Sequence, residues 1–137
     1  YRKIVNIWDI SWSKEIAENS FNWAIELEKN SCNLEHSSES QRNWYGENLY
    51  AIWWVGWKPK YTLEEVVKSW WDEKKNFDEK NWICFNNSIC WHYTQIVWKN
   101  TKKFGCAKAK CSFDKKITEI IVCQYNPAGN YIGEKPY

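Results

Sequence analysis

Six cysteines in a chain of 137 residues constrain the fold more than any other feature of this sequence. Cysteines at this density are typical of small extracellular proteins, where they form disulfides. Six cysteines allow 15 pairings, and their order along the chain does not choose among these. Zinc ligation is the alternative, since Cys106 and Cys111 lie close together, but no second close pair matches them to complete a site. We therefore prefer disulfides.

Several properties of the whole chain limit the functions that it can have. The chain starts at Tyr1 rather than Met, which together with the cysteines favours a mature secreted protein whose signal peptide has been removed. No apolar run is long enough to span a bilayer. The net charge of +2 is too small to indicate a nucleic-acid partner or strong attraction to anionic membranes. Six lysines between residues 102 and 116 are interpreted as a solvated rim. The length fits one domain over residues 1–137, expected to be monomeric.

Three helices are predicted in the first part of the chain. Residues 13–28 follow a capping serine, Ser11 or Ser13, and present an apolar stripe of Ala17, Phe21, Ala24 and Ile25. A second helix is predicted to begin near Glu47 and to end before residues 56–59. Thr62 and Glu65 form a capping box for a third helix that reaches about Lys74, with a buried stripe of Leu63, Val66, Val67 and Trp70.

Strand-like runs dominate the last third of the chain. They cover residues 93–98, 105–110 and 117–125, whereas residues 30–46 and 75–91 have the composition of loops. Helices followed by strands indicate an α+β fold in which helices cover an antiparallel sheet.

Four short blocks identify the chain more closely: Tyr45–Leu49 (YGENL), Trp70–Glu73 (WWDE), His92–Trp98 (HYTQIVW) with the following Gly105 and Cys106, and Cys123–Tyr131 (CQYNPAGNY). Together they resemble the signature blocks of the CAP superfamily (cysteine-rich secretory proteins, antigen 5 and pathogenesis-related protein 1), nearest to the plant proteins. The resemblance covers nearly the whole chain. It implies a disulfide-stapled, three-layer α–β–α sandwich around a central antiparallel sheet, with the pairs Cys32–Cys111, Cys84–Cys90 and Cys106–Cys123.

The same resemblance points to a central cleft. Glu47, Glu73 and His92 match family positions at which two glutamates and two histidines converge and can hold a divalent metal. Glu73 lies seven residues after Val66 and so points along the buried helix stripe, where a carboxylate needs a partner. The fourth position, a histidine, is expected just upstream of Tyr1, outside this chain, and His36 is interpreted as structural. Two alternatives follow: zinc in the cleft, or hydrogen bonding of the three side chains to one another, which we prefer.

Catalysis is not expected in this cleft. Ser69 and Thr94 are the nucleophiles that a triad with His92 could use, but neither stands in a G-x-S-x-G elbow. We therefore predict no catalytic residue and no required cofactor. A metal-dependent hydrolase is kept as the third hypothesis.

Aromatic residues suggest a lipid ligand. Phe77, Trp82 and Phe85 fall in the region linked to sterol binding in relatives, and aromatic faces suit a flat, rigid sterol. Trp53, Trp54 and Trp57 form either an exposed ridge that contacts lipid or a partner, or a cluster packed over the sheet. Several of the 12 tryptophans stand where relatives have small residues, and a tryptophan at positive φ costs about 1 kcal/mol.

The C-terminal residues 127–137 resemble a defence peptide that plant relatives release by cleavage, which here would fall between Asn126 and Pro127. Relatives carry Cys-Asn-Tyr before the cut, whereas this chain carries Cys-Gln-Tyr; the segment also has the composition of a tight turn. The leading hypothesis is a secreted, non-catalytic defence protein that binds sterol or a fatty-acid-like lipid and restrains sterol-dependent microbes. The alternative is a signalling protein that acts on a receptor through surface loops or through a peptide released by a protease.

Overall fold

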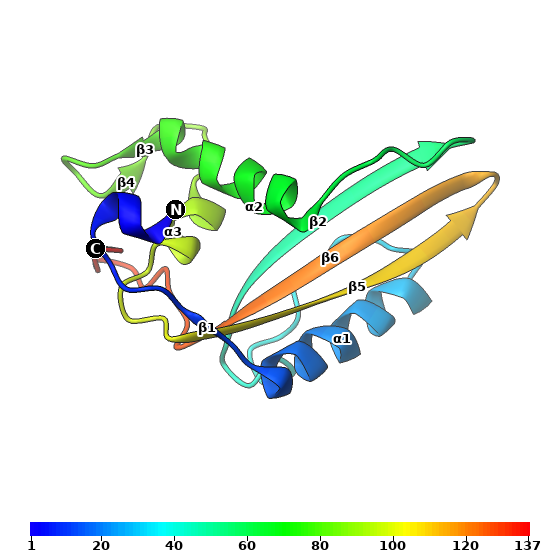
Figure 1. Cartoon of the computed structure of the whole chain (residues 1–137), viewed down its shortest axis with the longest axis horizontal. Coiled ribbons are helices and arrows are strands. Elements are labelled where there is room, and N and C mark those ends of the chain that lie inside the picture. Colours follow the sequence, from blue (N-terminus) through cyan, green and yellow to red (C-terminus); the bar gives the residue numbers. More distant parts are fainter.

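A computed structural model describes all 137 residues and shows three layers, with a sheet between helices (Figure 1). Helix α1 (Lys14–Lys29) covers one face of the sheet, and helices α2 (Leu63–Trp71) and α3 (Trp91–Ile96) lie on the other. The strand order is β1-β5-β6-β2. The remaining elements are the 3-10 helices η1 (Arg2–Val5) and η2 (Asp72–Asn76) and the strands β1 (Ser11–Trp12), β2 (Gly46–Val55), β3 (Phe77–Asp78), β4 (Ile83–Cys84), β5 (Lys103–Phe113) and β6 (Lys116–Asn126). The α+β prediction is confirmed.

The sheet is antiparallel except at one edge. Strands β5, β6 and β2 pair antiparallel, and the two-residue β1 pairs parallel with β5. Ile120 and Val122 of β6 face α1, whereas Ile121, Cys123 and Tyr125 face α2 and α3. Because both faces of β6 are covered, its sequence is almost continuously apolar rather than alternating.

Helix α1 has the predicted cap but a different buried face. The Ser13 hydroxyl accepts a hydrogen bond from the Ile16 amide, as expected for an N-cap. The buried residues, however, are Ile16, Ser20, Ala24 and Leu27, and Phe21 of the predicted stripe is exposed. Ser20 is acceptable in this core because its hydroxyl donates to the Gly105 carbonyl at 2.9 Å. Gly105 allows this contact, since a Cβ there would lie 2.2 Å from the Ala17 nitrogen.

Two predicted elements were of the wrong type. The segment from Glu47 is strand β2, not a helix, because it pairs with β6 along ten residues, from Gly46 opposite Tyr125 to Val55 opposite Lys116. The predicted strand 93–98 is mostly helix α3, which packs into the core against α2 and η2. Tyr93–Ile96 are all buried, so this helix shows no amphipathic period in the sequence.

Other predictions are confirmed. Helix α2 begins with the Thr62–Glu65 capping box, and Val66 and Trp70 are buried, although Leu63 is exposed. The three disulfides are those implied by the family resemblance. None of the helices is both long and apolar enough to cross a bilayer. Trp44 and Trp82 do adopt positive φ, at 60° and 61°.

The Cys32–Cys111 disulfide is expected to contribute more stability than the short Cys84–Cys90 bridge, because it joins residues 79 rather than 6 positions apart. In the chain-entropy model the losses on replacing each pair by serine are about 4 and about 2 kcal/mol. Urea unfolding of the two double variants measures both values. Equal losses would contradict the entropic ranking.

Candidate functional site

Glu47 lies at the start of β2 and is fully surrounded by donors. Its Oε1 accepts from the Ser37 amide at 3.0 Å and from His36 Nδ1 at 2.8 Å, and its Oε2 accepts from the Ser37 hydroxyl at 2.7 Å and from Gln124 Nε2 at 2.9 Å. The side chain is only 1% exposed. Burial alone would raise its pKa, but the hydrogen bonds from His36, Gln124 and Ser37 outweigh burial and hold the pKa below 4.5. Glu47 is therefore a buried carboxylate at neutral pH.

Glu73, in η2, forms a second pair with His92. Its Oε1 accepts from His92 Nδ1 at 2.6 Å, and its Oε2 accepts from the backbone amides of His92 and Tyr93 at 3.1 and 3.4 Å. These amides open α3, whose Cys90 cap offers no side-chain acceptor. A carboxylate at this position satisfies free N–H groups and complements the helix dipole. Glu73 thus fixes both the imidazole and the helix that carries it.

The Glu47–His36 pair and the His92 member of the second pair line one cavity of about 390 Å³, together with Asn48, Ile89, Trp91 and Asn130. His36 therefore belongs to the cleft, and its interpretation as a purely structural residue outside the cleft was wrong. The second imidazole at this cavity is that of His36, from the loop before β2. The one signal in the sequence for this role of His36 was the scarcity of histidine, because the chain has only two.

These side chains, as placed, do not form a metal centre. No group of three or more His, Cys, Asp and Glu side chains is close enough to hold an ion. Each Nδ1 already binds a different carboxylate, so a zinc ion would have to displace or reorient part of both pairs. The geometry favours the hydrogen-bonding interpretation, although His92 bonds with Glu73 alone and Glu47 with His36 instead.

The proposed nucleophiles are engaged elsewhere. The Ser69 hydroxyl donates to the Val66 carbonyl of its own helix, at 2.7 Å. The Thr94 hydroxyl lies within hydrogen-bond distance of the Cys90 carbonyl and of Asn130 Oδ1. Neither is bonded to His92, so the cleft contains no nucleophile–base pair.

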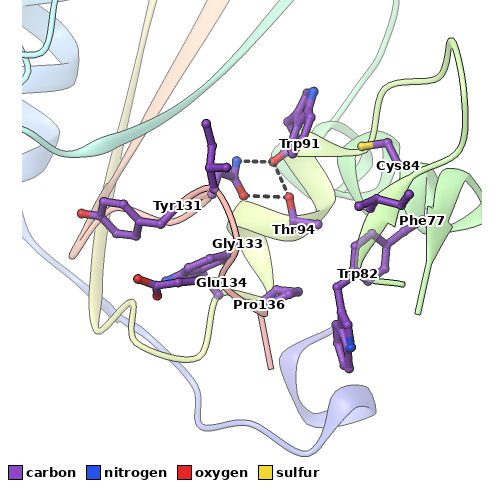
Figure 2. Close-up of a pocket in the computed structure, with 13 residues that line it drawn as sticks. Phe77, Trp82, Cys84, Trp91, Thr94, Tyr131, Gly133, Glu134 and Pro136 are labelled. Carbon is purple, nitrogen blue, oxygen red and sulfur yellow. Dashed lines mark hydrogen bonds between the residues drawn. The ribbon is translucent and has the colours of Figure 1, made fainter. Parts of the chain in front are cut away.

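A second, more apolar cavity of about 450 Å³ lies beside this cleft (Figure 2). One wall is the β3–β4 region, with Phe77, Trp82, Ile83 and Cys84, and α3 contributes Trp91 and Thr94. The opposite wall is the C-terminal segment, from Asn130 to Pro136. Phe85 does not line this cavity and is 52% exposed. Of the three predicted lipid-binding aromatics, the fold brings Phe77 and Trp82 together and leaves Phe85 outside.

The C-terminal wall is held by several contacts. The Tyr137 hydroxyl lies 2.9 Å from that of Tyr93 and donates to Glu79 at 3.1 Å, and the Tyr137 ring packs edge-on against Trp82. Around the predicted cleavage point, the Lys102 amide donates to the Asn126 carbonyl and the Thr101 hydroxyl to the Pro127 carbonyl, both at 2.9 Å. The bond between Asn126 and Pro127 is therefore part of ordered structure.

A family model described as the cysteine-rich secretory protein family, CAP, matches residues 1–125. The chain belongs to this family. Curated relatives include the pathogenesis-related protein PR-1 of Medicago truncatula, 37% identical over 99% of this chain and 72% of the relative. Pathogenesis-related protein 1A of Nicotiana tabacum is 35% identical over 99% of this chain and 74% of its own length.

Solved CAP structures share the fold. Venom allergen-like protein 4 of Schistosoma mansoni superposes with a TM-score of 0.71 at 26% identity, covering 96% of this chain and 75% of that one. NaASP2, crystallised with Zn²⁺, gives a TM-score of 0.68 at 27% identity, covering 96% of this chain and 66% of that one. The zinc is a feature of the NaASP2 crystal structure.

Replacing Glu47 by Gln is expected to destabilise this CAP protein by about 2 kcal/mol at pH 7, because an amide cannot accept from all the buried donors around it. The depressed pKa of Glu47 means that the carboxylate's contribution is present above pH 4.5 and is lost as pH falls through its folded pKa. The difference between wild type and Glu47→Gln should therefore shrink in acid. Urea unfolding at pH 7 and pH 3 measures it, with the exposed neighbour Glu35→Gln as control. A pH-independent difference would contradict this role.

Proposed function

We propose that this CAP protein is secreted and binds a sterol, or another flat apolar lipid, in the cavity between the β3–β4 region and the C-terminal segment. The observation that carries the proposal is the lining of this cavity, in which 8 of the 13 residues are hydrophobic. Its volume of about 450 Å³ falls within the range typical of small-ligand sites, about 300–1,000 Å³. The three disulfides suit an oxidising, extracellular setting.

A few polar groups in this cavity suit a ligand that carries one hydroxyl. Thr94 and Asn130 are bonded to each other at 2.7 Å, and Asn130 Nδ2 donates to the Trp91 carbonyl at 2.9 Å (Figure 2). The remaining lone pairs of the two side-chain oxygens are available to accept from a ligand hydroxyl. An otherwise apolar site with one polar end matches the amphipathic shape of a sterol.

Similarity to plant pathogenesis-related proteins supports a defence role, in which lipid capture restrains microbes that depend on external sterol. No catalytic step is part of this proposal, because neither Ser69 nor Thr94 is activated by His92. The single domain expected over residues 1–137 is part of the same proposal.

Replacing Trp82 by Ala is expected to weaken sterol binding by about tenfold or more, since it removes an aromatic wall of the cavity. Folding should be retained, because alanine is no worse than tryptophan at the positive φ of this position. Competition of labelled by unlabelled sterol measures the effect. The matched control is Phe85→Ala, which removes an exposed aromatic outside the cavity. Equal losses in both variants, or no loss in Trp82→Ala, would refute the assignment of this cavity.

The second candidate function is release of residues 127–137 as a signalling peptide. Because residues 130–136 form one wall of the cavity, release would also remove that wall. Lipid binding and peptide release are thus alternatives for any one molecule. Cleavage requires the C-terminal segment to open first, since the backbone on both sides of the cleavage point is hydrogen-bonded.

Loosening this segment is expected to favour cleavage and to weaken lipid binding together. Tyr137→Phe removes only the hydroxyl contacts with Tyr93 and Glu79, whereas Tyr137→Ala also removes the ring that packs on Trp82. Mass spectrometry of chains exposed to extracellular proteases should show the least cleavage after Asn126 in wild type, more in Tyr137→Phe and the most in Tyr137→Ala. Sterol affinity should be highest in wild type, lower in Tyr137→Phe and lowest in Tyr137→Ala. Affinity unchanged in Tyr137→Ala would contradict the coupling.

A further inference from the structure

The sheet ends in a protruding tip that no helix covers. Beyond the Cys32–Cys111 disulfide, β2, β5 and β6 continue past the end of α1 (Figure 1). We call residues 53–60 and 108–118 the hairpin tip. At the end of the sheet, Lys116 pairs with Val55 on one side and with Phe113 on the other. Two residues farther from the end of β2, Trp53 pairs with Thr118. These side chains share the sheet face that α1 covers farther along.

Large apolar side chains at this tip face solvent. Trp57 is 97% exposed, Phe113 79%, Val55 63% and Trp53 62%. Trp54 points to the other face and is buried beneath Lys58. Trp53 and Trp57 of the predicted ridge are therefore exposed, and so is Phe113 of the β5–β6 hairpin. Large apolar side chains exposed together at one end of a sheet are typical of an interaction surface.

The tip is also more basic than the rest of the chain. Residues 53–60 and 108–118 hold six lysines and one acidic residue, Asp114, although the whole chain has a net charge of only +2. Lys58 and Lys108 neutralise the buried Glu119 from 2.9 and 3.1 Å. Lys60, Lys110, Lys115 and Lys116 form no ion pair. Lys116 lies 4.7 Å from the centre of the Trp53 ring, so charge and aromatic surface are presented together.

We propose that the hairpin tip docks on an anionic lipid bilayer, with its aromatic side chains in the headgroup region and its lysines against acidic lipids. Tryptophan and lysine are side chains that combine an apolar body with a polar end, which suits that region. Charge complementarity favours an acidic surface, since the tip presents four lysines that form no ion pair. The low net charge of the chain concealed this local concentration of lysines.

The test is co-sedimentation of the full chain with sterol-free vesicles of phosphatidylcholine, with or without about one third phosphatidylserine. Sterol-free vesicles separate this surface from the cavity proposed above, and Trp82→Ala should bind them as wild type does. Binding is expected only with phosphatidylserine and should fall as salt screens the charges. Trp57→Ala/Phe113→Ala and Lys115→Gln/Lys116→Gln should each reduce it about tenfold or more. Trp8→Ala, which removes an 84% exposed tryptophan outside the tip, should not.

Three results would overturn the proposal: no binding to acidic vesicles by wild type, binding that both tip variants retain, or equal loss in Trp8→Ala. A dimer in sedimentation velocity that Trp57→Ala/Phe113→Ala dissociates, without vesicle binding, would reassign the tip to a protein contact. Circular dichroism of each variant, unchanged from wild type, establishes that lost binding is not lost folding.

Discussion

Burial of β6 on both faces is the constraint on which the rest of this structure depends. Ile120 and Val122 complete the core beneath α1, and Ile121, Cys123 and Tyr125 complete the core beneath α2 and α3. The strand is paired on both edges, with β5 and β2, and is covalently joined to β5 through Cys106–Cys123. Every other layer is therefore positioned by reference to this one strand. Two polar side chains of β6 are buried, and both are hydrogen-bonded. Glu119 binds Tyr61, Lys58 and Lys108, and Gln124 binds Glu47.

Glu119 shows how firmly such a group is held. Burial would raise its pKa, but hydrogen bonds from Tyr61, Lys58 and Lys108 lower the pKa to about 2. The Tyr61 and Lys58 contacts join β6 to the connection between β2 and α2, so a polar residue inside the sheet fixes the path of a loop. Buried carboxylates act in the same way at the cleft, where Glu47 holds the loop before β2 and Glu73 holds the first turn of α3.

Local signals in the sequence predicted what local interactions determine. The Ser13 cap, the Thr62–Glu65 capping box and the strand-like runs at 105–110 and 117–125 depend on neighbouring residues and were predicted. Strand β2 was predicted as a helix, and helix α3 as a strand. Their conformations depend on partners far along the chain, which are β6 for the strand and Glu73 for the helix. Edge and core contacts of this kind override local propensity.

The candidate site shows the same division. Resemblance placed Glu47, Glu73 and His92 at one cleft, but the role of His36 depends on how the loop before β2 folds back onto Glu47, which no spacing rule predicts. Likewise, Phe77 and Trp82 line a cavity only because the C-terminal segment crosses in front of them, and Phe85 lies beyond its reach.

The segments that line the cavity (the β3–β4 region, α3 and the C-terminal segment) lie at the opposite end of the molecule from the hairpin tip (Figure 1). A molecule resting on a bilayer by its tip would hold its cavity at the end that lies away from the lipid surface. A ligand could not slide directly from the membrane into the site and would have to cross solvent. Uptake would then be limited by how often a lipid leaves its own membrane, rather than by contact between the protein and the bilayer.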